Sequence, residues 1–308
     1  MHLQRSRDLG PDIDALALGA GGRVGLDTVL GDLDQRLRRT WAPGLAVRRA
    51  WTWSAADRRD PKWWPQGISA SPGPERVLAV SWYATSGGSR LSFLDLDSRR
   101  YRHVTLVRPD GDGGRLPLKI HAGGIAWHGP WLHLAATRGG FWSCHVDDVI
   151  RTEEGYELPV RFRYSSPEKT DDQLRFSFLT IDGEELVAGE YGGAAQSRRL
   201  ARVALDPETL LPVTDGDDQV VPVVTDHGVV RAQGVARIGG RHYLTASHGP
   251  WALGSIWAGE PDGFRERRWA VPMGPEDLAY DADGNWLLTV TEHPRRRWVV
   301  AMRPSSFD

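Results

Sequence analysis

Short apolar runs separated by polar turns recur along most of the chain, and one pattern returns about five times. Each copy starts with a polar and a small residue, enters an apolar strand, and continues through a hairpin turn into a second strand. Successive copies begin about 45–60 residues apart, a spacing typical of four-stranded propeller blades. The copies begin at residues 65–69, 121–126, 173–177, 232–236 and 275–279. The pattern predicts an all-β fold, a five-bladed β-propeller.

The first residues of the chain follow a different pattern. Residues 1–24 are rich in Gly and weakly patterned, which predicts a loose arm. Five apolar residues in 25–41 fall at helical spacing: Leu26, Val29, Leu30, Leu33 and Leu37. Aspartates come early and arginines late in this segment, an order that suits a helix dipole. We therefore expect an arm and an amphipathic helix in 1–44, and a single propeller domain in 45–308.

The last repeat is one strand short. It has strands expected near 276–280, 285–291 and 296–302, after which the sequence ends. The extended apolar segment 45–53 is in surplus and comes just before the first blade. We expect this segment to supply the missing outer strand of the last blade. Closing the ring in this way removes sheet edges that would invite aggregation.

Composition and charge limit the chemistry. The 14 Trp, 35 Gly and 20 Pro fit many short strands joined by tight turns. The single cysteine, Cys144, excludes an internal disulfide and a cysteine-based zinc site, and its place in a strand predicts a buried structural thiol. The net charge is −2, so we expect neither nucleic acid nor a membrane as a partner.

Several expected signals are missing from the sequence. No apolar stretch approaches the length of a membrane span, and no hydrophobic signal segment follows Met1. These features predict a cytoplasmic protein if Met1 is the native start. The nucleotide-binding glycine motifs and the serine-hydrolase elbow are also missing from the sequence, so we expect no redox cofactor.

The mouth of the channel is where chemistry is expected. The start of each inner strand and the end of the next strand lie on the same face of a propeller, so residues distant in sequence meet there. The strand starts supply Gln66, His121, Gln233 and Glu276. The strand ends supply Trp82, Tyr83, Arg138, Glu190, Tyr191, His248 and Glu292. Polar groups at equivalent positions of every blade predict a site for a small-molecule ligand.

Three chemistries fit these residues. The candidate catalytic residues are His121, Glu190, His248, Glu276 and Glu292, and the candidate substrate-binding residues are Gln66, Trp63, Trp64, Trp82, Tyr83, Arg138, Tyr191 and Gln233. A His–Glu pair suits general acid/base catalysis, two carboxylates such as Glu190 and Glu292 suit glycoside cleavage, and His with carboxylates suits a divalent metal. The sequence does not fix distances across the channel, so all three stay open. A structural role is the alternative for each polar residue, and packing between blades is the alternative for each Trp.

Three runs carry a resemblance to known proteins. They are residues 119–127, 186–191 and 274–280, which read KIHAGGIAW, LVAGEY and GPEDLAY. Together they resemble a group of actinobacterial β-propeller proteins, often secreted and without an assigned function. The resemblance covers most of 60–303 and implies the fold but no catalytic residues. Because this chain has no secretion signal, the resemblance suggests an intracellular member that serves secondary metabolism.

Our functional hypothesis is an enzyme that acts on a small organic molecule by acid/base chemistry. The reaction would be a hydrolysis, elimination, isomerisation or cyclisation. The alternative is a non-catalytic propeller that binds a carbohydrate or another small ligand through the aromatic residues at the mouth. A third hypothesis, a scaffold for protein interactions, requires a large apolar patch on the rim.

Overall fold

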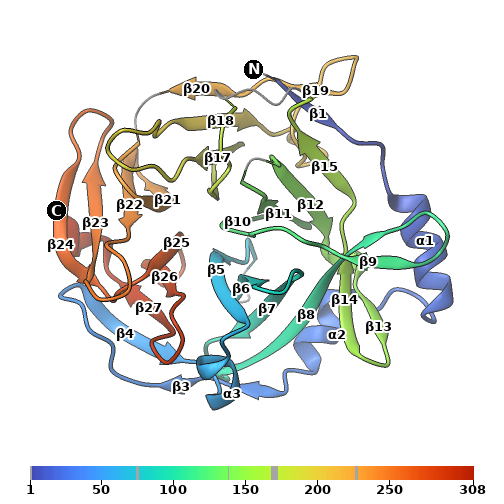
Figure 1. Ribbon diagram of the computed structural model, residues 1–308, viewed down its shortest axis with the longest axis horizontal. Coiled ribbons are helices and arrows are strands. Elements are labelled where there is room, and N and C mark those ends of the chain that lie inside the picture. Colours follow the sequence, from blue (N-terminus) through green and yellow to red (C-terminus); the bar gives the residue numbers. More distant parts are fainter. Residues whose placement is uncertain (1, 74–75, 138, 168–172, 226–227) are drawn as a thin grey trace.

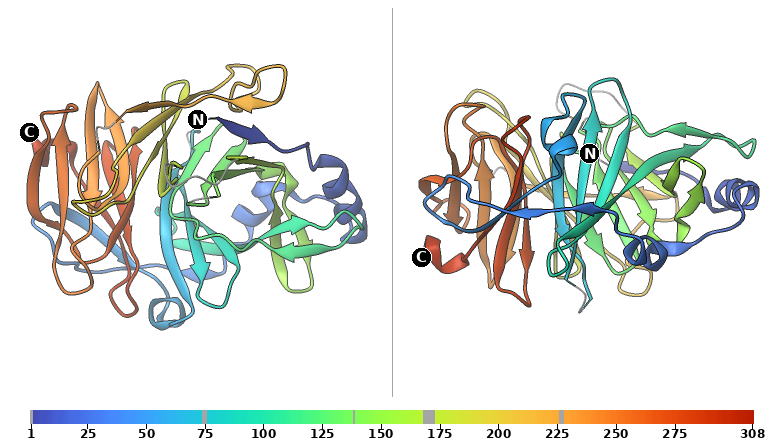
Figure 2. Two further views of the ribbon diagram at one scale, coloured as in Figure 1. Left: turned by 45° about the horizontal axis from the view of Figure 1, so that its top comes forward. Right: turned by 90° about the horizontal axis from the view of Figure 1, so that it is seen from below.

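The computed structural model describes residues 2–73, 76–137, 139–167, 173–225 and 228–308. The chain forms an all-β propeller in which strands surround a central axis and the few helices lie outside them (Figure 1). Figure 2 shows the N-terminal segment running across the outside of the propeller. Among the described residues, no helix is long and apolar enough to cross a membrane.

The described strands fall into five sheets of at least four strands each. The inner strands are β5 (Trp63–Ala70), β10 (Ile125–His128), β16 (Phe178–Asp182), β21 (Ala232–Ile238) and β25 (Pro275–Asp281). The second strands are β6 (Val77–Ala84), β11 (Trp131–Ala135), β17 (Glu185–Gly189), β22 (Arg241–Ala246) and β26 (Trp286–Thr291). The third strands are β7 (Ser89–Asp95), β12 (Phe141–His145), β18 (Leu200–Ala204), β23 (Gly254–Gly259) and β27 (Trp298–Met302).

The fourth strands complete these sheets, and further short strands extend three of them. The fourth strands are β8 (Arg100–Pro109), β15 (Phe162–Ser165), β20 (Val223–Thr225), β24 (Arg265–Val271) and β4 (Val47–Thr52). The additional strands are β2 (Gln35–Arg36), β9 (Arg115–Pro117), β13 (Ile150–Thr152) and β14 (Gly155–Pro159) in the first sheet, β1 (Leu3–Arg5) and β19 (Gln219–Val220) in the second, and β3 (Arg38–Arg39) in the last. All neighbours pair antiparallel except β14 and β8, which run parallel.

The sheet that contains the last repeat takes its outer strands from the start of the chain. Strand β4 pairs antiparallel with β27, placing Trp51 opposite Val299 and Thr52 opposite Trp298. Strand β3 then pairs with β4. The surplus segment 45–53 therefore lies beside the last strand of the chain.

Close contact between inner strands explains the small residue in the repeated pattern. A side chain at Gly124 would meet the backbone of Leu179 on β16 at 2.3 Å, and one at Gly234 would meet the backbone of Leu278 on β25 at 2.3 Å. Contacts this short are sterically forbidden, so only glycine fits at these points. The strand middles are buried and pack between sheets, with Trp53 and Trp82 edge to face at 4.7 Å between ring centroids.

The expectations for residues 1–44 were largely wrong. Residues 1–24 are not a loose arm, because β1 pairs with both β15 and β19 and is followed by helix α1 (Gly10–Gly19). The helix expected over 25–41 is limited to α2 (Gly25–Gly31). Gly31 ends it, since glycine weakens a helix interior and favours its end. The chain then becomes extended, and Leu37 is buried next to strand residues rather than on a helix face.

The three other helices are short. They are α3 (Ala55–Arg59), η1 (Val146–Asp148) and η2 (Pro304–Phe307). Helix α3 begins at Ser54, whose hydroxyl accepts a hydrogen bond from the backbone N–H of Asp57. Cys144 is buried, as expected, and burial raises the pKa of its thiol.

Candidate active site at the channel mouth

A cavity of about 330 Å³ opens at one mouth of the central channel. Starts of inner strands and ends of second strands contribute its walls, as the repeated pattern predicted. The lining residues are Gln66, His121, Gly123, Thr137, Ser177, Tyr191, Gln233, Glu276 and Glu292. The structure therefore brings together six of the residues chosen from the sequence: Gln66, His121, Tyr191, Gln233, Glu276 and Glu292.

Glu276 and Glu292 form a carboxyl pair in this cavity. Glu276 lies at the start of β25 and is 3% exposed, whereas Glu292 directly follows β26 and its side chain is 20% exposed. The two carboxyls lie close enough to shift each other's pKa: Glu292 raises the pKa of Glu276, and Glu276 lowers that of Glu292. Burial, the charge of Glu292 and the charge of Asp277 raise the pKa of Glu276 well above its usual range. Two carboxyls in contact cannot both ionise easily, so the pair holds a proton.

Two glutamine side chains orient this pair. Gln66 donates from Nε2 to Glu292 Oε2 over 3.1 Å and to the carbonyl of Pro65 over 3.0 Å. Gln233 donates from Nε2 to Glu276 Oε1 over 3.0 Å. Burial raises the pKa of Glu292, while the bonds from Gln66 and Glu276 oppose that rise. Glu292 is therefore the more easily ionised member of the pair.

His121 supplies a third titratable group at the mouth. It lies in the loop before β10, and its ring stacks on Tyr83 of β6 with centroids 4.4 Å apart and planes inclined by 22°. Desolvation lowers the pKa of His121, which keeps the ring neutral and able to accept a proton. Burial and the charges of Glu292 and Glu276 raise the pKa of Tyr83, which places Tyr83 within electrostatic reach of the carboxyl pair.

Asp277 joins three sheets next to this cavity. Its side chain is fully buried, and Oδ2 accepts the backbone N–H groups of Ile68 on β5 and Ile125 on β10 at 3.3 and 3.1 Å. One carboxyl from β25 thus binds two other inner strands and fixes their spacing. Burial raises the pKa of Asp277 well above its usual range, although backbone hydrogen bonds oppose the rise.

Glu190, predicted as a catalytic residue, is not part of the cavity lining, and its contacts indicate a structural role. Its carboxylate accepts two bonds from the Arg199 guanidinium, at 3.1 and 3.0 Å, and backbone N–H groups of Arg175 and Arg199 at 3.0 Å each. Burial would raise its pKa, but these bonds lower it to about 2. A carboxylate held this firmly in the ionised form is a poor general acid or base at neutral pH.

We expect Glu190→Gln to destabilise the protein by about 1–3 kcal/mol, because it leaves Arg199 without its counter-charge. The pKa of Glu190 is depressed on folding, so its stabilisation is complete above the unfolded pKa of about 4.3 and is lost as the pH falls towards 2. Urea denaturation between pH 3 and 7 measures the difference. Glu184→Gln, at an exposed neighbouring position, is the control and should match the parent protein. Equal stability of Glu190→Gln and the parent protein at pH 7 would contradict the structural role.

His248, predicted as an acid or base, is not part of the cavity lining either. It follows β22, and its Nε2 lies 2.8 Å from Ser255 Oγ on β23 and 3.5 Å from Glu266 on β24. These strands are the outer ones of their sheet. The ring therefore ties the loop after β22 to the outside of the blade.

The predicted aromatic binding residues mostly serve packing. Trp82 is fully buried and donates from Nε1 to Ser92 Oγ at 2.8 Å. The Arg90 guanidinium lies over the ring of Trp63, with Cζ of Arg90 4.5 Å from the ring centroid. Trp64 donates to the Pro61 carbonyl and packs edge to face on His293. None of the three tryptophans lines the cavity, and Arg138 lies outside the described residues.

Several residues at this site were not among the selected candidates, although the ends of the second strands include Thr137 and His293. Gly123, Thr137 and Ser177 line the cavity, and His293 lies with Nδ1 3.7 Å from Glu292 Oε1. Arg297 is fully buried and donates from Nε to the Glu292 carbonyl at 2.8 Å. Gly123 and Ser177 do fall within the repeated pattern, in the copies at 121–126 and 173–177. No pattern in the sequence marks Arg297, since it comes from an ordinary Arg-rich turn.

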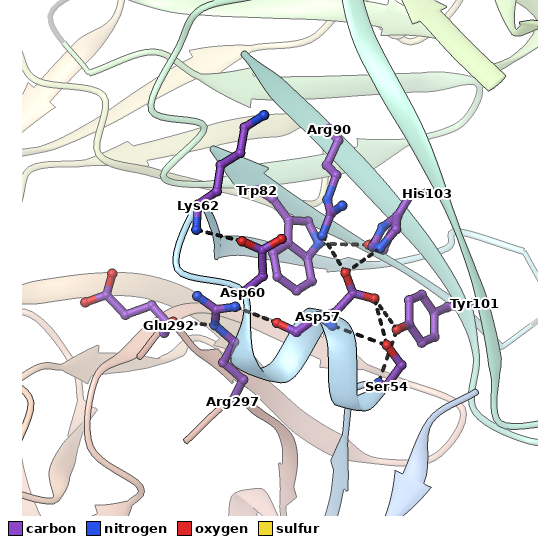
Figure 3. Close-up of polar contacts among 11 residues, drawn as sticks. Ser54, Asp57, Asp60, Lys62, Trp82, Arg90, Tyr101, His103, Glu292 and Arg297 are labelled. Atoms are coloured by element: carbon purple, nitrogen blue, oxygen red, sulfur yellow. Dashed lines mark hydrogen bonds and ion pairs between the residues drawn. The ribbon is translucent and has the colours of Figure 1, made fainter. Parts of the chain in front are cut away.

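Behind the site lies a buried chain of hydrogen bonds that superficially matches a catalytic triad (Figure 3). Ser92 Oγ lies 2.8 Å from His103 Nδ1, and His103 Nε2 lies 3.0 Å from Asp57 Oδ1. Ser92 is fully buried and already accepts the bond from Trp82, so no substrate reaches it. The chain therefore holds β6, β7, β8 and helix α3 together rather than performing catalysis.

Arg297 connects this chain of hydrogen bonds to the mouth. It donates from Nη1 to the Asp57 carbonyl at 2.5 Å and from Nε to the Glu292 carbonyl (Figure 3). Its guanidinium also packs over Trp64 and Trp82. Burial lowers the pKa of Arg297 to about 10, so it remains a cation at neutral pH. The backbone that carries Glu292 is thus fixed by a buried charge.

The sequence left a divalent metal site open, but the described residues supply no group of ligands for one. Among the described residues, no three His, Cys, Asp or Glu side chains gather closely enough to hold a metal ion.

Comparison with known proteins gives no family. The sequence matches no known protein family and no curated protein. Among solved structures, it is similar to a gluconolactonase from Xanthomonas campestris, with 13% identity, a TM-score of 0.45 and 88% of each chain covered. It is also similar to glutaminyl cyclase from Myxococcus xanthus, with 12% identity, a TM-score of 0.45, and 87% of this chain and 97% of that chain covered. At these scores the similarities carry no argument about function.

Proposed function

We propose that this protein is an enzyme that acts on a small organic molecule in the mouth cavity, using acid/base chemistry. The observation that carries the proposal is that Glu276 and Glu292 both line the cavity, each held by a glutamine, and shift each other's pKa. Paired titratable groups with separated proton affinities are a common basis of acid and base roles in one site. In this pair Glu276 is the acid and Glu292 is the base.

The short separation of the carboxyls favours some reactions over others. Glycosidases place their two carboxyls about 5–10 Å apart, with the glycosidic bond or a water between them. Glu276 and Glu292 are close enough to shift each other's pKa, which favours a smaller separation than glycosidases use. Such a pair suits reactions in which one oxygen takes a proton while the other gives one, as in hydrolysis by an activated water, or proton transfer next to a carbonyl group. We therefore favour isomerisation, or hydrolysis of a bond other than a glycosidic bond.

The other cavity residues have supporting roles in this proposal. Neutral His121 serves as a second proton acceptor at the mouth, held in orientation by its stack on Tyr83. Tyr191 is 42% exposed at the cavity and provides a flat face for an apolar part of the substrate. Gln66 and Gln233 keep each carboxyl in its place.

We further propose that the five sheets are the blades of a five-bladed propeller and that β4 closes its ring. The antiparallel pairing of β4 with β27 supports closure, because it joins the N-terminal segment to the last strand of the chain. A ring closed in this way holds the inner strands at fixed separations. Such rigidity supports a site whose residues come from all five repeats.

A comparison of small-molecule extracts tests the function. Extracts from cells with and without the gene are profiled, and the differing fraction is incubated with purified protein, with Glu276→Gln, and with the exposed control Glu184→Gln. We expect a precursor that accumulates without the gene and is converted by the parent protein and by Glu184→Gln, but not by Glu276→Gln. Binding of that compound without conversion would instead support the non-catalytic alternative, and conversion by Glu276→Gln would refute the assigned role.

A further inference from the structure

The loop between β3 and β4 carries large apolar side chains on its outside. Trp41 is 78% exposed and Leu45 is 75% exposed, whereas their small neighbours Ala42 and Ala46 are buried at 3% and 6% exposure. Folded proteins normally bury the large apolar residue and expose the small one. The inverted order indicates that Trp41 and Leu45 are directed outwards to contact something other than this chain.

A third exposed large apolar residue, Trp269, belongs to the strand that this loop contacts. Leu45 N–H donates to the carbonyl of Trp269 over 2.8 Å, and Ala46 N–H donates to that of Ala270, so the loop runs along β24 (Figure 1). Trp269 is 60% exposed. It occupies an irregular part of β24, where the register shifts between Gly254 and Ile256, and its φ is 58°. A bulky residue rarely takes this left-handed conformation, and strain of this kind clusters at functional positions.

The chain segments that carry these three residues are strongly basic. Residues 36–49 and 265–271 together contain eight arginines and one glutamate. Among the described residues, no carboxylate pairs with Arg38, Arg39 or Arg48, and all three are exposed. We name Trp41, Leu45, Trp269, Arg38, Arg39 and Arg48 the tryptophan–arginine rim. The chain's net charge of −2, from which we expected no membrane contact, conceals this local positive charge.

We propose that the tryptophan–arginine rim docks the protein on an anionic lipid surface. The charge of the rim is complementary to acidic headgroups, and exposed Trp and Leu insert at the boundary between headgroups and acyl chains. The apolar side chains protrude instead of lining a groove, which suits a deformable surface better than a rigid partner. The rim is independent of the proposed enzymatic function, because none of its residues lines the mouth cavity.

Vesicle binding tests this proposal. Purified protein is mixed with vesicles of phosphatidylcholine alone, or of phosphatidylcholine with phosphatidylglycerol, and bound protein is measured by co-sedimentation. We expect binding to the anionic vesicles only, weakening as salt is raised. Arg38→Gln with Arg39→Gln should weaken binding about 25-fold, at about fivefold for each arginine. Trp41→Ser with Trp269→Ser should weaken it more than about tenfold.

The chain offers matched controls. Trp251→Ser removes a tryptophan that is 84% exposed but outside the rim, where Arg296 packs over its ring at 4.3 Å. Arg231→Gln with Arg295→Gln removes two exposed arginines elsewhere. Both controls should bind as the parent protein does. Absence of binding to anionic vesicles, or equal losses in the rim and control variants, would overturn the proposal. Binding to polyglutamate but not to vesicles would overturn it too, and would indicate an acidic protein partner.

Discussion

Glu276→Gln is expected to make the protein more stable at neutral pH while strongly lowering turnover. The Gln side chain reproduces the protonated carboxyl: its amide donates to Glu292 and its oxygen accepts from Gln233. The substitution also replaces a buried carboxyl group, whose ionisation at neutral pH is unfavourable, by a group that does not ionise. A gain of about 0.5–2 kcal/mol is typical when strain at an active site is relieved. Loss of the transferable proton should lower turnover by about 10²–10⁴-fold.

The pH dependence of this effect has a definite sign. The folded pKa of Glu276 lies well above its unfolded value, so the folded state binds more protons than the unfolded state between the two values. The stability of the parent protein should therefore fall as the pH rises above the unfolded pKa of about 4.3. The Glu276→Gln variant should not show this decrease in stability as the pH rises. The two proteins should have nearly equal stability near pH 4 and separate progressively towards pH 8, as measured by urea denaturation.

The exposed substitution Glu184→Gln controls for removal of a negative charge in general. It should leave both the stability and its pH dependence unchanged. If Glu276→Gln is less stable than the parent at every pH, Glu276 is an ionised, favourably paired carboxylate, and the proton-sharing pair is disproved. Glu190→Gln supplies the opposite case, since a carboxylate with a depressed pKa should lose stability on replacement.

Repeats in the sequence predicted which residues gather at the mouth, but only for positions that topology alone determines. The start of an inner strand faces the axis in every blade, so Gln66, Gln233 and Glu276 were located from the pattern. The end of a second strand is less constrained. Glu190 and Glu292 occupy equivalent positions, yet only Glu292 lines the cavity, because Glu190 pairs with Arg199, which directly precedes β18.

The N-terminal region shows a second limit of the sequence pattern. The apolar spacing of 25–41 fits a helix, but Gly31 and the following aspartates end it after two turns. The remaining residues become short strands that exist only because β8 and β4 offer free edges. Strand β1 is also short, at three residues, and is stabilised by pairing with β15 and β19. Strands of this length depend on tertiary contacts that local patterns do not encode.

Asp57→Asn is expected to destabilise the fold by about 3–5 kcal/mol, the largest effect among these variants. Asp57 Oδ1 accepts from Arg90 at 2.9 Å and from His103 at 3.0 Å, while Oδ2 accepts from Tyr101 at 2.5 Å (Figure 3). The side chains of Asp57 and Arg90 are each only 11% exposed. An uncharged amide leaves the Arg90 cation buried without its counter-charge. Its NH₂ group also faces donors where the carboxylate accepted hydrogen bonds.

A matched control and the pH dependence make this prediction specific. Asp60→Asn changes a nearby aspartate whose Oδ1 accepts the backbone N–H of Lys62, and it should cost less than about 1 kcal/mol. Burial would raise the pKa of Asp57, but His103, Arg90 and Tyr101 lower it below its usual range. Its stabilisation is thus complete above the unfolded pKa of about 3.9 and declines below it, so Asp57→Asn and the parent protein should converge in acid. A constant difference down to pH 2 would show that packing, and not the buried charge pair, is what Asp57 provides.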